Sequence, residues 1–218
     1  MATKATARAR PAREAAKRKS ETRRARSDLY RRLIVDGAER LFAQRSIDET
    51  KMEEVSAEAG LSLGTVYSVF AGKADLVAAI HDARLAELLS ASIEEARGGA
   101  TTIELLIAGL QGYIRYFLEH PNYLRMHLRE GYAWSGEHAA PTRERAAAWT
   151  EGLAVLTSLI ERGRSDGEFH CGEPRVEARM LIATQQVQLA DWVEQGMKRP
   201  IGNVLADVES YVRRMFPQ

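Results

Sequence analysis

Residues 31–80 read RRLIVDGAERLFAQRSIDETKMEEVSAEAGLSLGTVYSVFAGKADLVAAI. Two short segments in this stretch, about Lys51–Ala59 and Leu63–Phe70, carry apolar residues at helical spacing. Gly60 lies between them and suits the left-handed conformation that ends a helix, and Ser62 can cap the helix that follows. Helices of this length are unstable alone, so they need a core supplied by the preceding residues. The pattern predicts a helix-turn-helix.

Outward from this stretch, nearly every segment of the 218-residue chain has helical spacing, and no run of alternating β-branched residues predicts a strand. We therefore expect an all-α fold. The nine expected helices lie at about Ser27–Gln44, Lys51–Ala59, Leu63–Phe70, Lys73–Ala96, Thr101–His120, Tyr123–Glu130, Pro141–Arg162, Pro174–Gln195 and Ile201–Phe216. They divide into a helix-turn-helix domain at 27–75 and a larger helical domain at 76–218, after a basic N-terminal arm at 1–26 that we expect to be disordered.

Two helix starts carry the residue pair of a capping box. Thr50 and Glu53 have this spacing before the second helix, and Thr101 and Glu104 have it before the fifth. In each pair, the hydroxyl is expected to accept a hydrogen bond from a backbone N–H group of the first turn, which would fix where the helix begins.

Charge is distributed unevenly along the chain. The 31 lysines and arginines nearly balance the 30 acids, and the formal net charge is +1. Residues 1–32, however, hold 12 basic and three acidic side chains, a net charge of +9, which leaves −8 on the other residues. A basic arm on an acidic body suggests a polyanionic partner, with which the arm would add phosphate affinity or reach a minor groove. A solvated, disordered tail, an organellar transit peptide and a nuclear signal remain alternatives for the same segment.

Composition excludes several other classes of protein. One cysteine, Cys171, rules out an intramolecular disulfide and a CxxC zinc site, and no apolar run is long enough to span a membrane. The chain has no Gly-rich phosphate loop, GxSxG or HExxH motif. We therefore expect a protein that is cytoplasmic, is not an enzyme and has no cofactor, metal or catalytic residue.

The second helix of the helix-turn-helix carries the residues that suit a DNA groove. Its outward positions are small and polar, which would permit close approach to base edges in the major groove; they are Ser62, Gly64, Thr65 and Ser68.

The stretch from Arg31 to Ile80 resembles the DNA-binding domain of the TetR family of bacterial transcriptional regulators. The matching residues, in order, are Ala38, Leu41, Phe42, Ala43, Thr50, Ala59, Gly60, Leu61, Ser62, Gly64, Thr65, Tyr67, Phe70, Lys73 and Leu76. Beyond residue 80 the resemblance is one of architecture only. It implies a homodimer, joined through its last two helices, that reads an inverted repeat in double-stranded DNA and represses transcription until a small organic ligand releases it.

Carried onto this sequence, the resemblance also implies individual DNA contacts. Thr50 and Lys51 would meet phosphate at the start of the second helix. Tyr67 would place its hydroxyl on phosphate, and Lys73 would meet the backbone. The residues that would face bases are Ser62, Gly64 and Thr65.

The larger domain supplies candidates for a ligand site. Aromatic and polar side chains on its middle segments offer apolar walls with polar tips, although ordinary core packing is the alternative for each of them. These candidates are Tyr113, Tyr116, Phe117, His120, Tyr123, Met126, His127, Tyr132, Trp134 and Trp149. Gln185, Gln186 and Gln188 lie among apolar residues, as a polar seam at a dimer interface or as amides that line a pocket. A DNA-binding structural or interaction protein without an inducer is the alternative function.

Overall fold

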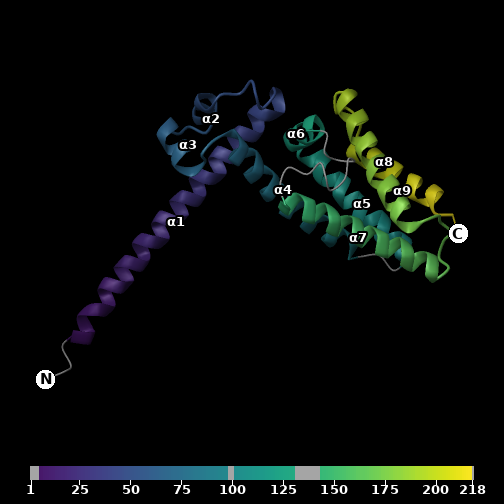
Figure 1. Ribbon diagram of the computed structural model, residues 1–218, viewed down its shortest axis with the longest axis horizontal. Helices are drawn as coiled ribbons and strands as arrows, with labels where there is room; N and C mark the ends of the chain where they lie inside the picture. The colour runs from purple at the N-terminus through teal and green to yellow at the C-terminus, as the bar shows by residue number, and fades with distance from the viewer. Residues whose placement is uncertain (1–4, 98–100, 131–142, 218) are drawn as a thin grey trace. The chain divides into compact units, whose positions relative to one another are not determined.

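The computed structural model describes residues 5–97, 101–130 and 143–217 (Figure 1). The secondary structure of these residues is nine α-helices, without a strand, as the sequence predicts. They form two compact units, Met1–Ile80 and His81–Gln218, and helix α4 (Lys73–Ala96) begins in the first and ends in the second. The division falls five residues after the expected boundary.

The first unit is built on α1 (Ala5–Gln44), against which α2 (Met52–Glu58) and α3 (Leu63–Val69) pack. The side chains that join the three helices are almost completely buried; they are Ile34, Ala38, Phe42, Val55, Val66 and Phe70. Gly60 has a φ of 66°, so the turn between α2 and α3 uses the left-handed conformation that the sequence predicts. The Ser62 hydroxyl accepts a hydrogen bond from the Thr65 N–H at 3.2 Å and caps α3 as expected.

The start of α2 differs from the sequence prediction. Lys51, and not Thr50, occupies the N-cap position, and the Glu54 carboxylate accepts a hydrogen bond from the Lys51 N–H at 2.8 Å. This backbone hydrogen bond lowers the pKa of Glu54 below its usual value. The capping interaction is therefore shifted by one residue from the expected Thr50–Glu53 pair.

The N-terminal arm is a second correction. The sequence interpretation placed the start of the first helix at Ser27, after a disordered arm at 1–26, whereas α1 is helical from Ala5 (Figure 1). Alanine, arginine, lysine and glutamate dominate this segment, and all four have high helix propensity. Lys17 and Glu21 form an i,i+4 ion pair at 3.8 Å.

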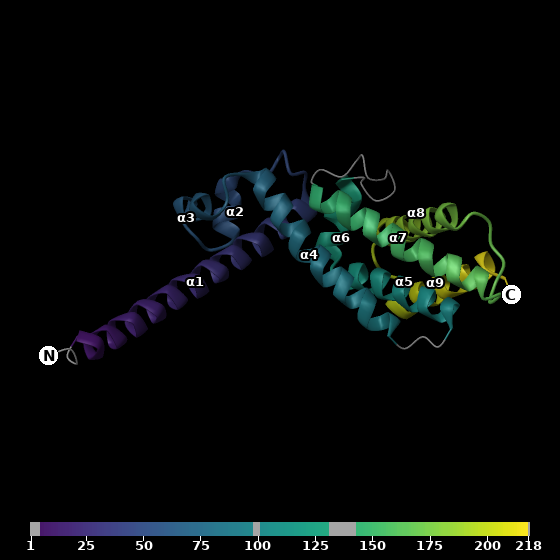
Figure 2. The ribbon, with the colours of Figure 1, turned by 60° about the horizontal axis from the view of Figure 1, so that its bottom comes forward.

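The second unit places α5 (Thr102–Glu119) among α6 (Pro121–Glu130), α7 (Arg143–Ser165), α8 (Pro174–Glu194) and α9 (Ile201–Met215) (Figure 2). The capping box of Thr101 and Glu104 and the proline that opens α8 are confirmed. Pro121 opens α6 two residues earlier than expected, because proline lacks only an N–H group that the first turn leaves unbonded. Among the residues described, no single helix is long and apolar enough to cross a membrane.

A carboxylate from a distant turn supports the start of α5. Glu168 follows α7, and its carboxylate accepts hydrogen bonds from the Thr102 hydroxyl and the Thr102 N–H, both at 2.7 Å, and from the Ile103 N–H at 3.4 Å. The hydroxyl bond and the two backbone bonds hold the pKa of Glu168 below its ordinary value. This capping arrangement joins the first turn of α5 to the turn that follows α7.

We expect Glu168→Gln to lower the free energy of unfolding by about 1 kcal/mol at pH 7, because it removes a charged cap from a helix N-terminus. The folded-state pKa is depressed, so the carboxylate stabilises the fold above the ordinary glutamate pKa of about 4.3 and loses this effect as the pH falls through the folded value. Urea unfolding of both proteins should show their difference shrinking below about pH 4. Glu161→Gln, at an exposed site on α7, is the control. A difference that stays constant with pH would contradict the assignment.

Candidate DNA-binding surface and ligand cavity

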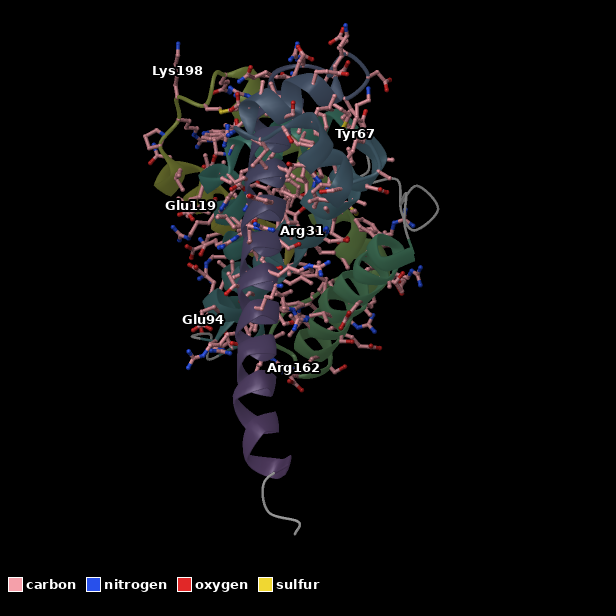
Figure 3. The ribbon with its side chains drawn as sticks, turned by 90° about the vertical axis from the view of Figure 1, so that its left-hand side faces the viewer. Arg31, Tyr67, Glu94, Glu119, Arg162 and Lys198 are labelled. Atoms are coloured by element: carbon pink, nitrogen blue, oxygen red, sulfur yellow. The ribbon has the colours of Figure 1, made fainter. Side chains whose placement is uncertain are left out.

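One face of α3 is exposed while the opposite face is buried. Val66 is fully buried, whereas Ser62, Gly64 and Ser68 are exposed and Thr65 is half-buried. The Tyr67 side chain, labelled in Figure 3, is 49% exposed although it is large and aromatic. The polar residues of α3 therefore lie on its exposed face, which is the face that the sequence analysis predicts to approach DNA.

The hydroxyl groups on α3 are held by local hydrogen bonds. The Ser62 and Thr65 hydroxyl oxygens lie 2.8 Å apart, and the Ser68 hydroxyl donates to the Thr65 carbonyl at 2.6 Å. A hydroxyl oxygen that makes one such bond can still accept another. These local bonds orient the side chains, which lowers the entropy that a base contact would cost.

Two of the residues predicted to meet phosphate have structural partners instead. Thr50 is 1% exposed, and its hydroxyl donates to the Ser46 carbonyl at 3.0 Å, so its side chain closes the turn before α2 and does not reach the surface. The Lys73 ammonium donates to the carbonyls of Ile47 and Asp48 at 2.8 and 3.0 Å. Lys73 thus ties the start of α4 to this turn, and a phosphate contact would use its remaining N–H bond. Lys51 is exposed, as its predicted role requires.

The predicted ligand residues of α5 and α6 are brought together, but mainly as core. Phe117 is fully buried; its ring stacks on that of Tyr123 with centroids 5.5 Å apart, and lies 5.1 Å from Tyr113 and 4.8 Å from His127. Met126 is also buried. Most of this cluster therefore packs the interior of the second unit.

The tyrosine hydroxyls of the cluster bond to neighbouring helices. Tyr116 donates to Glu87 of α4 at 2.6 Å and stacks on His120, and Tyr113 accepts from the Gln186 amide at 2.9 Å. Burial raises the pKa of both hydroxyls, and for Tyr116 the bond to Glu87 raises it further. Burial also raises the pKa of Glu87, but the bonds from Tyr116 and Arg84 outweigh it and leave that pKa lowered. Both tyrosines therefore stay protonated.

A cavity of about 730 Å³ lies between α6 and α8. Its α8 side is largely apolar, whereas its α6 side carries the cationic side chains of Arg125 and Arg129. The lining residues are Arg125, His127, Leu128, Arg129, Ala183, Gln186, Val187, Ala190, Val193 and Glu194. Its size is that of sites that bind small organic molecules.

The cavity is lined by few of the residues that the sequence singled out. His127 and Gln186 line it, whereas Gln188 lines a smaller hollow of about 30 Å³ beside Trp192 and Arg199. Trp149 is half-buried on α7 and lines neither, and Tyr132 and Trp134 lie outside the described residues. The sequence analysis did not predict Arg125 and Arg129 as ligand residues, because exposed arginines on a helix ordinarily indicate only a solvated face.

Buried amides on α8 are the remaining unusual feature of this unit. Gln185 is 1% exposed, and neither atom of its amide has a hydrogen-bond partner among the residues that the structure describes. Within the same residues, the Gln186 carbonyl is also buried without a partner, although its amide nitrogen bonds to Tyr113. A buried amide in this state costs about 1–3 kcal/mol, so α8 carries polar groups that a bound molecule could satisfy. Among the described residues, no group of histidine, cysteine or acidic side chains is placed to hold a metal ion.

Comparison with known proteins agrees with this architecture. Residues 34–80 match the family described as bacterial regulatory proteins, tetR family. A search of curated proteins finds no match. Among solved structures, a tetR family regulatory protein from Rhodococcus RHA1 is 22% identical, with a TM-score of 0.72 over 85% of this chain and 96% of that chain.

Two similar structures contain small molecules. The transcriptional regulator FadR from Bacillus subtilis, in complex with stearoyl-CoA, is 19% identical, with a TM-score of 0.68 over 83% of this chain and 96% of that chain. SmeT in complex with triclosan is 20% identical, with a TM-score of 0.66 over 87% of this chain and 92% of that chain. At these identities the likeness establishes a shared fold.

The exposed polar face of α3, held by a helix-turn-helix core, defines a DNA-binding transcriptional regulator. Residues 34–80 therefore form a DNA-binding domain of the kind found in the tetR family of bacterial regulatory proteins.

We expect substitutions at neighbouring positions of α3 to have different effects. Tyr67→Phe should weaken binding to every duplex about fivefold, because it removes one hydroxyl bond, of about 1 kcal/mol, to a phosphate that carries no sequence information. Thr65→Val should instead change which base pairs are preferred. Each variant is the control for the other in a binding assay over a set of single-base-pair variants of the bound sequence. Equal loss on every duplex for the Thr65 variant would contradict its base-reading role.

Proposed function

We propose that this protein is a homodimeric repressor that binds an inverted repeat and is released from it by a small molecule with an apolar body and an anionic group. The observation that carries the ligand-responsive part is the cavity between α6 and α8, which combines an apolar wall with two arginines. The DNA-binding residues we propose are Lys51, Ser62, Gly64, Thr65, Tyr67, Ser68 and Lys73.

An exposed apolar stripe on α8 supports the homodimer. Val176, Met180 and Val187 are 53%, 50% and 68% exposed, and their spacing of four and seven residues places them on one face of the helix. Contiguous apolar surface of this kind usually marks a protein interface. The exposed positions of α9 include small residues at i, i+4 and i+8, which would let a partner helix approach closely; they are Gly202, Ala206 and Ser210.

The dimer interface and the cavity share a residue. Val187 belongs to the exposed stripe of α8 and also lines the cavity. A partner helix on this stripe would therefore cover part of the cavity mouth. Ligand binding and dimer geometry would then be coupled through α8, which is what a ligand-controlled dimer requires.

The lining of the cavity defines the chemistry of the ligand. Alanine and valine side chains of α8 would contact an apolar chain or ring, and the Arg125 and Arg129 guanidinium groups of α6 would pair with a carboxylate or phosphate. The similar FadR structure holds stearoyl-CoA and the similar SmeT structure holds triclosan. The acyl-CoA fits this lining better, because it combines a long apolar chain with phosphate groups.

Release from DNA would follow from a population shift. The dimer would sample one arrangement in which both α3 helices match the half-sites and another in which they do not, and the ligand would favour the second. To move the population decisively, it must prefer that arrangement by a few kcal/mol. Helix α4 is the physical link, since it carries Lys73 at its start and is bonded to α5 through Glu87 and Tyr116. A regulator of the same fold that responds to no ligand is the second candidate, and the assay below separates the two.

We expect stearoyl-CoA to release the protein from its DNA site, and Arg125→Gln to weaken this response at least fivefold, because a charge-assisted hydrogen bond would be lost. DNA release would be followed by fluorescence anisotropy, with triclosan as a second probe. The control is Arg115→Gln on α5, whose side chain pairs with Glu95 and does not line the cavity. If neither molecule binds, or if both variants respond equally, the ligand assignment is wrong.

A further inference from the structure

Residues 17–29 of α1 form a strongly basic helical segment, and no described residue of the same unit covers their side chains. Figures 1 and 2 show this part of α1 extending beyond α2 and α3. Every side chain from Lys17 to Leu29 is exposed. A helix that is polar on all sides and lacks a packing surface gains little from the fold. Its charge therefore needs another explanation.

The charges on this helix are divided between two faces. The acids Glu14, Glu21 and Asp28 recur every seven residues, so they lie along one stripe. Each is preceded by a basic residue four positions earlier, and one such pair, Lys17 with Glu21, is an ion pair in the structure. The opposite face carries basic residues without acids; they are Lys19, Arg23 and Arg26, at i, i+4 and i+7.

The acid-free face is available for a partner. Lys19, Arg23 and Arg26 are exposed and make no ion pair with any residue that the structure describes. Three like charges on adjacent turns repel one another, which disfavours the helix in isolation. A row of phosphates would relieve this repulsion and would release counterions from the DNA.

We propose that this face of α1 binds the phosphate backbone of double-stranded DNA beside the sequence that α3 reads. The sequence left two contacts open for the arm, with phosphates or within the minor groove. An α-helix is about 10–12 Å wide, whereas the minor groove is about 6 Å wide. Because the arm is helical, it lies against the phosphates and does not enter the minor groove. Residues 5–29 span about 37 Å, close to the length of one DNA turn of about 34 Å. The inference rests on the proposed function, because it needs a bound DNA site.

The extension continues directly from the DNA-reading part of the unit. Arg31, labelled in Figure 3, lies with its guanidinium 4.8 Å from the centre of the Phe70 ring, at the end of α3. The basic segment of α1 therefore ends about one turn before the point where α1 contacts the recognition helix α3. A rigid α1 would hold the basic segment and α3 on the same duplex. This continuity favours DNA over another polyanion as the partner.

The test compares two triple variants that remove equal charge. Lys19→Gln, Arg23→Gln and Arg26→Gln change the acid-free face, whereas Arg10→Gln, Lys17→Gln and Arg24→Gln change the residues that precede an acid. Glutamine preserves helix propensity, and far-UV circular dichroism checks the fold. Binding of each full-length variant to the DNA site selected by the wild type is measured between about 50 and 200 mM salt, with the slope of log K against log salt as the readout.

The variant Lys19→Gln, Arg23→Gln, Arg26→Gln should bind DNA at least tenfold more weakly at low salt, and its slope should be smaller by about 2 or more, since each lost phosphate contact changes the slope by about 0.9. The control variant, Arg10→Gln, Lys17→Gln, Arg24→Gln, should change the slope by less than half as much. Removing about ten flanking base pairs from each side of the DNA should weaken binding by the wild type and leave binding by the first variant unchanged. Equal changes of the slope in the two triple variants, or no change in either, would overturn the proposal. It would also be overturned if the arm bound phosphatidylserine vesicles in a charge-dependent way while DNA affinity did not change on removal of the flanking base pairs. Absence of a selected site for the wild type would instead overturn the proposed function.

Discussion

The burial of Val66 and Phe70 against α1 and α2 is the interaction on which the DNA-binding surface depends. Helices α2 and α3 have seven residues each, too few to hold a helical conformation alone, so their structure comes from the core that Phe42, Val55 and these two side chains form. The same packing turns the polar side of α3 outward. Lys73 adds a second constraint, because its ammonium ties the first turn of α4 to the carbonyls of the turn before α2.

The sequence predicts the fold well where local signals and burial agree. Gly60, Ser62, Thr101 and Pro174 mark helix boundaries through backbone chemistry that needs no distant partner, and the structure places all four as expected. The cap of α2 was misplaced by one residue because Thr50 and Lys51 are both followed by a glutamate three positions later. The helical arm was missed because high helix propensity and high net charge predict opposite outcomes for the same segment.

The candidate sites were less predictable, since they depend on contacts between distant residues. Sequence patterns could show that aromatic residues gather on two helices, but not that Phe117 and Met126 would fill the core while Arg125 and Val187 would line a cavity. Likewise, only the structure shows that the Thr50 hydroxyl is bonded inside a turn. The exposed apolar stripe of α8 is evident only after the other helices have covered the remaining faces. Each of these features is decided by which neighbour a side chain meets.

We propose that this chain recognises a defined DNA sequence as a symmetric dimer. Selection of bound duplexes from a random-sequence pool, with purified full-length protein at about 150 mM salt, tests it most directly. We expect enrichment of an inverted repeat whose half-sites lie about one or two helical turns apart, about 10 or 20 base pairs between centres, because the two α3 helices must enter major grooves on the same side of the duplex. Enrichment of no sequence, with binding that disappears as salt rises, would contradict it and would leave only charge-driven attachment through α1.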